Sequence, residues 1–138
     1  MTDKQLDGTT GNSTPPPVTL PADVKSQVKF SPPTDEDMNV LTQLRSTSEP
    51  WRARGESPEQ TLESLTKLRP FISVARVSGG IIGYITIERD GPVPGAAYLR
   101  NIVVRNEHRQ KGLGGILLDH GLETARDMSR KTLALRVD

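Results

Sequence analysis

The sequence predicts an α/β chain, α+β in the wider sense, with a mixed and mostly antiparallel sheet. Two runs rich in β-branched residues, 71–77 and 81–88, flank Ser78-Gly79-Gly80, which is a hairpin signal. A further apolar run, 96–104, passes through a glycine-containing turn into a helix-like segment over 113–130. Antiparallel strands followed by a strand that leads into a helix therefore define the fold class.

The first part of the chain adds one short strand and two helices. Residues 28–30 have the pattern of a strand, which Pro32-Pro33 stops. Thr34 then caps a helix that ends before Pro50. A second helix begins at Ser57-Pro58-Glu59-Gln60, which supplies the cap, an N1 proline and a capping-box glutamine. The apolar residues at helical spacing are Met38, Leu41 and Leu44 in the first helix and Leu62, Leu65 and Leu68 in the second.

The last predicted elements are the helix over 113–130 and a strand over 132–137. They complete the order strand, two helices, three strands, helix, strand. His108 is expected in a solvated loop and His120 on the helix surface, and two histidines alone do not make a metal-ligand cluster. The helix is expected to bury Leu113, Ile116, Leu117, Leu122, Ala125 and Met128.

Length and composition indicate one folded domain preceded by an arm. A chain of 138 residues is long enough for a single core. Residues 1–27 are rich in Pro, Thr, Ser and Gly, and they carry too little apolar surface to offset the entropy of ordering. We therefore expect a disordered arm over 1–27 and a domain over 28–138.

Charge and residue usage exclude several classes of function. With 18 basic and 17 acidic side chains the net charge is +1, which argues against binding to nucleic acid or to a membrane surface. Cysteine is absent, which excludes disulfides, thiolate metal sites and a cysteine nucleophile. The N-terminus has no apolar leader and no run is long enough to span a bilayer, so we expect a cytoplasmic protein, without a metal.

The most informative segment is residues 104–115, VRNEHRQKGLGG, between the last long strand and the helix. Backbone N–H groups at the start of a helix have no intrahelical partner, and the helix dipole favours an anion there. Gly112 and Gly114 leave this backbone bare, and a side chain at either position would keep a phosphate away. We therefore predict a phosphate site, with Arg109 and Lys111 beside it.

The glycine spacing separates three kinds of phosphate loop. A P-loop requires four residues between a first glycine and Gly-Lys-Ser/Thr, and the sequence has no such string. A dinucleotide fingerprint requires a third glycine where Leu117 stands. The remaining pattern, Arg109-x-x-Gly112-x-Gly114, resembles the acyl-CoA pyrophosphate loop of the GNAT superfamily of N-acetyltransferases. The resemblance covers residues 28–138, and the segments 81–87, 98–104, 113–130 and 132–137 match the family's third strand, fourth strand, third helix and fifth strand.

The resemblance implies a GNAT-like fold and an acetyl-CoA-dependent N-acetyltransferase. Acetyl-CoA would donate its acetyl group to an amine by direct attack in a ternary complex. The acceptor would be a small molecule, a protein N-terminus or a lysine, and a homodimer is left open. The alternative is a non-catalytic CoA-binding or protein-interaction module. The residues expected to bind CoA are Ile102, Val103, Val104, Arg109, Gln110, Lys111, Gly112, Leu113, Gly114 and Gly115.

No residue stands out as the general base that would take the proton of the amine. Some members of the family carry a glutamate early in the fourth strand, where this sequence has Tyr98, a poor base at neutral pH. Glu88 is the other candidate, although both also fit ordinary strand positions. Arg100 and Arg105 are expected to be solvated, and Trp51 is expected to pack against the first two helices.

The sequence stops after the fifth predicted strand, whereas the resemblance implies a further helix and two strands. That part would form the other wall of the CoA cleft and supply a proton donor for the leaving thiolate. Without it, the apolar residues Leu133, Leu135 and Val137 lose their cover. We therefore expect a fragment of a longer protein rather than a shortened protein completed by a partner chain.

Overall fold

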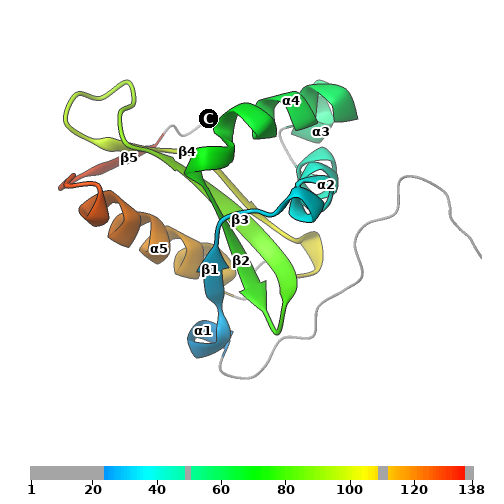
Figure 1. Cartoon of the computed structure of the whole chain (residues 1–138), viewed down its shortest axis with the longest axis horizontal. Helices are drawn as coiled ribbons and strands as arrows, with labels where there is room; N and C mark the ends of the chain where they lie inside the picture. Colours follow the sequence, from blue (N-terminus) through cyan, green and yellow to red (C-terminus); the bar gives the residue numbers. More distant parts are fainter. Residues whose placement is uncertain (1–23, 49–50, 109–111, 136–138) are drawn as a thin grey trace, which may run out of the picture.

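A computed structural model describes residues 24–48, 51–108 and 112–135. The elements in chain order are α1 (Val24–Gln27), β1 (Lys29–Ser31), α2 (Asp35–Ser46), α3 (Trp51–Arg54), α4 (Pro58–Leu68), the 3₁₀ helix η1 (Arg69–Phe71), β2 (Ile72–Val77), β3 (Gly80–Glu88), β4 (Ala97–Val104), the 3₁₀ helix η2 (Asn106–His108), α5 (Leu113–Asp127) and β5 (Leu133–Leu135). One sheet lies between two helical layers, with α5 on one face and α2 to α4 on the other (Figure 1).

The sheet confirms the predicted fold class. Its strand order is β1-β2-β3-β4-β5, with three antiparallel pairs followed by the parallel pair β4–β5. The hairpin between β2 and β3 turns through Ser78 and Gly79, whose φ angles are 51° and 83°. Two consecutive positive φ angles match the twist of the flanking strands, which is why short hairpins favour such turns.

Two segments that the sequence did not mark as helical form short helices. The last four residues of the expected arm, Val24–Gln27, form α1, and the half-buried side chain of Val24 packs against the core. The rest of that arm, residues 1–23, lies outside the described residues. The connection between the first two predicted helices contains α3, which brings the half-buried Trp51 against the core, as expected of that side chain.

The helix α5 ends at Asp127, three residues earlier than predicted. Ser129 adopts a φ of 64°, in the left-handed region, directly after the cap. The N–H of Arg130 then donates to the carbonyl of Ala125 at 2.9 Å, and the N–H of Ser129 donates to the carbonyl of Arg126 at 2.9 Å. This pair of bonds is a Schellman motif, which terminates a helix whatever helical character the following residues have.

Both long helices of the second layer begin at a capping box. Thr34 accepts from the N–H of Asp37 at 3.2 Å, and the Asp37 carboxylate accepts from the N–H of Thr34 at 2.7 Å. Ser57 and Gln60 make the same reciprocal pair at α4, as predicted from the sequence. These bonds satisfy backbone donors that have no intrahelical partner.

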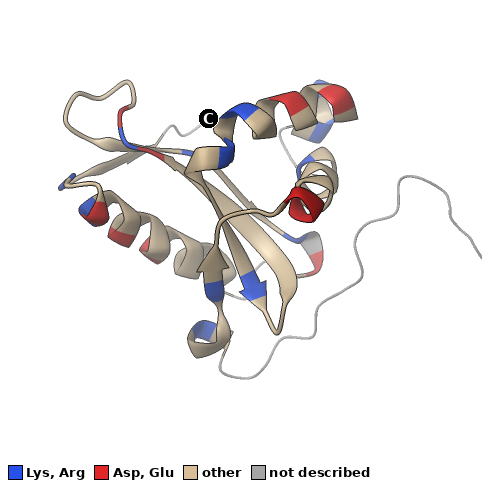
Figure 2. Cartoon of the chain, viewed as in Figure 1, with Lys and Arg blue, Asp and Glu red and all other residues tan. Residues whose placement is uncertain are grey.

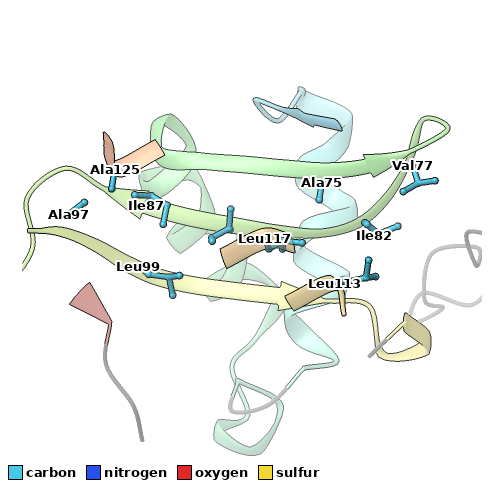
Figure 3. Packing of buried hydrophobic residues seen from close by; sticks show 10 residues of the cluster. Ala75, Val77, Ile82, Ile87, Ala97, Leu99, Leu113, Leu117 and Ala125 are labelled. Atoms are coloured by element: carbon cyan, nitrogen blue, oxygen red, sulfur yellow. The ribbon is translucent and has the colours of Figure 1, made fainter. Parts of the chain in front are cut away.

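The strand β3 is buried continuously from Ile81 to Ile87, because both helical layers pack against it. Figure 3 shows side chains from β2, β3, β4 and α5 meeting on one face. That cluster consists of Ala75, Val77, Ile82, Ile85, Ile87, Ala97, Leu99, Leu113, Leu117 and Ala125. The cluster on the other face consists of Met38, Leu41, Leu44, Leu65, Ile72, Val74, Ile81, Tyr84 and Val103.

The prediction that Leu122 is buried is wrong, and a smaller neighbour is buried instead; the same is seen at Leu62, which lies on the apolar stripe of its helix. Leu62 is 41% exposed, while Thr61 is fully buried on α4. Leu122 is 39% exposed, while Gly121 is the buried residue of α5. An added Cβ at Gly121 would lie 3.1 Å from the Ile85 side chain, so the glycine allows α5 to approach the sheet closely. Ile116 and Met128 are half-buried against the core.

Gly83 allows the closest approach within the sheet. It pairs with Val104 of β4, and an added Cβ would lie 2.3 Å from the carbonyl oxygen of Val103. Because the nearest atom belongs to the backbone, a side chain at this position would force the two strands apart. The position of β4 therefore depends on the absence of a side chain at residue 83.

A buried ion pair joins the first strands to the helix α2. Arg76 of β2 donates two hydrogen bonds to the Asp37 carboxylate and one, at 2.9 Å, to the Ser31 hydroxyl. The bond from Arg76, together with the capping bonds from Thr34, holds the pKa of Asp37 below its ordinary value of 3.8, although burial opposes this. The pair connects β1, β2 and α2 at one point.

We expect Gly83→Ala to destabilise the protein by about 1–3 kcal/mol, because the new methyl group meets backbone. The measurement is the free energy of unfolding in urea. The matched control is Gly114→Ala, where an added Cβ meets nothing within 4 Å in a helix; alanine there should be neutral or stabilising by roughly 0.5–1 kcal/mol. Equal stability of the two variants would contradict the close approach at Gly83.

We expect Asp37→Asn to reduce the acid sensitivity of folding. Because the folded pKa of Asp37 is depressed, its stabilisation is present above the ordinary pKa of 3.8 and is lost as the pH falls through the folded value. The melting temperature of the wild type should therefore fall more steeply than that of Asp37→Asn between about pH 5 and pH 2. Parallel curves would show that the pair with Arg76 does not contribute.

Candidate functional site

The site is built around the first turn of α5. Gly112 is the N-cap residue and has a φ of 80°, and the first intrahelical bond runs from the N–H of Ile116 to the carbonyl of Gly112. No described side chain caps this end of the helix. The N–H groups of Leu113, Gly114 and Gly115 therefore precede the first hydrogen-bonded turn, as expected for an anion-binding helix start.

The described part of the chain leaves space around this turn. Among the described residues, no atom lies within 4 Å of a Cβ added at Gly112, Gly114 or Gly115, and Gly114 and Gly115 are exposed. Leu113 is anchored in the core by its buried side chain, which fixes the direction of the backbone around it. The first turn of α5 contains no acidic residue, and Figure 2 shows the acidic residues of this helix further along it.

The basic residues of the motif are only partly described. Arg109, Gln110 and Lys111 lie outside the described residues, so their predicted contacts with a phosphate stay predictions. Arg105, expected to be solvated, is only 3% exposed and donates to the carbonyl of Ile81 at 3.3 Å. Its charge therefore secures the end of β4 to β3 rather than facing solvent.

Two histidines also differ from expectation. His108 is 6% exposed in η2, and its N–H donates to the carbonyl of Arg105 at 2.9 Å, so it belongs to the packed turn after β4. His120 is half-buried and stacks parallel on Phe30 of β1, with ring centroids 3.7 Å apart. Burial lowers the pKa of His120, against the opposing effect of Glu123 and Asp127. The burial of these two histidines could not be predicted, because a single polar residue in a sequence carries no sign that its side chain is enclosed.

The outer edge of β4 presents backbone groups from two of the three predicted positions. The N–H of Arg105 donates to β3, at the carbonyl of Ile82. Because backbone groups alternate sides along a strand, those of Val103 also point to β3, whereas those of Ile102 and Val104 point to the outer edge. The pairing with β5 involves Ala97 to Leu99 among the described residues.

A β-bulge lies in the middle of β4. Thr86 pairs with Asn101 and Ile87 pairs with Leu99, which leaves Arg100 as the extra residue. A bulge leaves a residue unpaired in the ladder and redirects its side chain. This bulge could not be predicted from the sequence, because β4 contains no glycine or proline at that point.

The two candidates for a general base lie beside this bulge. Glu88 is bound by the Arg100 guanidinium through two hydrogen bonds, one of them 3.2 Å long. The hydrogen bond to Glu88 raises the pKa of Arg100. Tyr98 pairs with Glu88 across the strands, and Arg100 lies 5.4 Å from the centroid of its ring. The structure thus brings the three side chains together, with Glu88 engaged in an ion pair.

A polar cluster covers the opposite face of the sheet, between α2, α3 and β3. Arg45 binds Glu56 through two hydrogen bonds of 3.0 Å and lies 4.7 Å from the centroid of the Trp51 ring. Thr61 donates to Glu56 at 2.6 Å. Burial alone would raise the pKa of Glu56, but the bonds from Thr61 and Arg45 leave it below the ordinary value. Burial raises the pKa of the Tyr84 phenol, which lies close to Arg45.

The comparison with protein families is decisive. The model of the family described as "Acetyltransferase (GNAT) family" matches residues 38–138. The chain belongs to the GNAT acetyltransferase family. This match includes the helix start at Gly112 and confirms the resemblance found in the sequence.

Solved structures agree with the GNAT assignment at the level of the fold. They include a transcriptional regulator from Bacillus halodurans C-125 (TM-score 0.64, 17% identity, 80% of this chain and 82% of that chain covered). Aminoglycoside N-acetyltransferase AAC(6')-Iy in complex with CoA matches with a TM-score of 0.63 and 17% identity over 80% of this chain and 77% of that one. The PaiA N-acetyltransferase from Thermoplasma acidophilum in complex with coenzyme A matches with a TM-score of 0.61 and 17% identity over 80% and 79%. No curated protein sequence matches this GNAT chain.

Two further features of the described residues concern metal binding and membrane insertion. In residues 24–48, 51–108 and 112–135, no group of three or more histidine, aspartate or glutamate side chains is arranged to hold a metal ion. Over the same described ranges, no helix of this GNAT domain has the length and apolar character needed to cross a bilayer.

Proposed function

We propose that this chain is an N-acetyltransferase that takes the acetyl group of acetyl-CoA and transfers it to an amine acceptor. Membership of the GNAT family associates the chain with acyl transfer in general. The observation that carries the proposal is the first turn of α5, which no described side chain caps and where added Cβ atoms at Gly112, Gly114 and Gly115 would meet no described atom within 4 Å. This geometry fits a diphosphate, because successive backbone N–H groups and the helix dipole both favour an anion.

The strand β4 supplies the second support. The outward-facing backbone groups of Ile102 and Val104 offer an extended amide-bearing arm the hydrogen bonds of an added strand. Such an arm, held at its phosphate end by α5, leads from Val104 toward the bulge at Arg100. Each charge-assisted bond to the phosphates is worth about 1.5–3 kcal/mol, so α5 supplies most of the affinity for the donor. The strand β4 sets the direction in which the arm of the donor extends.

The amine acceptor is a small molecule, a protein N-terminus or a lysine. Two solved neighbours act on small molecules by their names, the aminoglycoside enzyme and an N-acetylglutamate synthase from Neisseria gonorrhoeae complexed with coenzyme A and N-acetyl-glutamate. A primary amine is mostly protonated at neutral pH and must lose a proton before it attacks. Under the proposal this proton leaves to solvent, because Glu88 is bound to Arg100.

We expect Gly114→Glu to weaken CoA binding by about 100-fold or more, measured by calorimetric titration with CoA. A side chain on a helix leans toward its N-terminus, so the new carboxylate reaches the phosphate-binding turn. The negative charge of the new carboxylate also offsets the contribution of about two charge-assisted hydrogen bonds to the phosphates. The variant should still fold, because an added Cβ meets nothing and an acidic group stabilises a helix start.

The control for this variant is Leu118→Glu, which places the same charge one turn further along α5 at an exposed position. Its affinity for CoA should match the wild type. If Gly114→Glu bound CoA as tightly as Leu118→Glu, with both melting like the wild type, the phosphate site would lie elsewhere. Thiol release from acetyl-CoA with a panel of primary amines then separates a transferase from a non-catalytic CoA-binding module.

We expect Glu88→Gln and Tyr98→Phe to leave the shape of the pH–rate profile of thiol release unchanged. Removing the exposed ion pair with Arg100 should cost at most about 1 kcal/mol of stability. Loss of the acidic limb of the profile in Glu88→Gln alone would show that this carboxylate acts as the general base.

A further inference from the structure

Two buried polar atoms face each other across β3 and β4, beside the bulge. Thr86 is fully buried, and its hydroxyl has no hydrogen-bond partner among the described residues. Asn101, its cross-strand partner, is half-buried, and its amide oxygen is likewise buried and without a partner in the described part of the chain. A buried polar atom left without a bond costs about 1–3 kcal/mol, so two adjacent ones call for an explanation.

The nitrogen of the Asn101 side-chain amide sets the orientation of that side chain. Its Nδ2 donates to the carbonyl of Arg100 at 2.9 Å. The opposite orientation would place two carbonyl oxygens together, so the Oδ1 atom is committed to accepting a bond from elsewhere. The Thr86 hydroxyl can accept a bond through its oxygen and donate one through its hydrogen.

Both side chains lie on the face of the sheet that α2 and α4 cover, opposite to α5. Tyr84 and Val103 pair with each other and belong to the hydrophobic cluster on that face. Side chains two residues apart share a face, which places Thr86 beside Tyr84 and Asn101 beside Val103. Directly opposed residues have Cβ atoms roughly 5 Å apart, close enough for one small group to bond to both.

The pair lies where the reacting end of the donor would arrive. Asn101 is three residues before Val104, which is about 10 Å along a strand that rises roughly 3.3 Å per residue. An arm that starts at the first turn of α5 and follows the outer edge of β4 therefore reaches Asn101 and the bulge. An acceptor amine that approaches from the α2–α4 face would meet the donor beside these two oxygens, which are buried there.

We propose that Asn101 Oδ1 and Thr86 Oγ1 bind the amine group of the acceptor and orient it toward the acyl donor. The inference rests on the proposed transferase function and names its acceptor-binding residues. Both atoms are neutral acceptors that an amine nitrogen can satisfy through its N–H bonds. A carboxylate in this place would hold the amine as an ammonium ion, whereas neutral oxygens do not favour the charged form. The acceptor class is therefore a primary amine bound through its N–H donors rather than through an ion pair.

The first test is Thr86→Val, which keeps the shape of the side chain and removes its hydroxyl. Replacing an unsatisfied buried hydroxyl by a methyl group should raise the melting temperature. The same change should lower kcat/KM for the best amine of the panel by about tenfold, and leave the affinity for CoA unchanged. Asn101→Ala should raise KM for that amine by about tenfold or more and also leave CoA binding unchanged.

The matched control is Thr66→Val on α4, where the hydroxyl is exposed and bonds to the carbonyl of Leu62 at 2.7 Å. It should not raise the melting temperature or alter kcat/KM. If Thr86→Val and Asn101→Ala acetylate amines as the wild type does, this inference is wrong and the transferase proposal stands. If the wild type releases no thiol with any amine of the panel, the proposed function fails and this inference fails with it.

Discussion

The structure depends on one strand, β3, which is buried on both faces from Ile81 to Ile87. Ile82, Ile85 and Ile87 belong to the cluster on the α5 face, whereas Ile81 and Tyr84 belong to the cluster on the other face. Both helical layers therefore pack against this strand. Gly83 lets β4 lie against this strand without a side chain between them. Because Arg105 then bonds to the backbone of β3, the end of β4 and the turn toward α5 start from a fixed point.

Two different chemical environments lie on either side of this end of β4. On one side, the first turn of α5 presents backbone N–H groups that no described side chain caps, at three glycines with no described atom close to an added Cβ. On the other face, polar side chains of β3 and β4 gather around the bulge at Arg100. A donor held by its phosphates and an acceptor held by its amine would meet at β4, the strand that carries the bulge and precedes α5.

The sequence predicted the order of the main elements, because caps, turns and apolar spacing are local signals. The capping box at Ser57 and Gln60 and the hairpin at Ser78-Gly79 are examples. The side of each helix that meets the sheet was harder to predict. Leu122 was expected in the core and Leu62 lies on the apolar stripe of α4, but the buried residues are Gly121 and Thr61. Which residue of a stripe meets the sheet depends on how closely the helix approaches, and this is a tertiary property.

The candidate site was predictable only in part, for the same reason. The glycine pattern that starts α5 is local and was found. The burial of Arg105 and His108 depends on where β4 and its following turn pack, so both were expected in solvent and are enclosed. The bulge at Arg100, and with it the pairing of Thr86 and Asn101, follows from the register between two strands, for which single residues carry no signal.

The most direct test of the central claim is an NMR titration of the ¹⁵N-labelled protein with CoA. The account predicts that the amide resonances of Leu113, Gly114 and Gly115 shift first and most strongly, with those of Ile102 and Val104 following, and that inorganic pyrophosphate reproduces the first set alone. Shifts confined to other parts of the sheet, with the amides at the start of α5 unmoved, would contradict it.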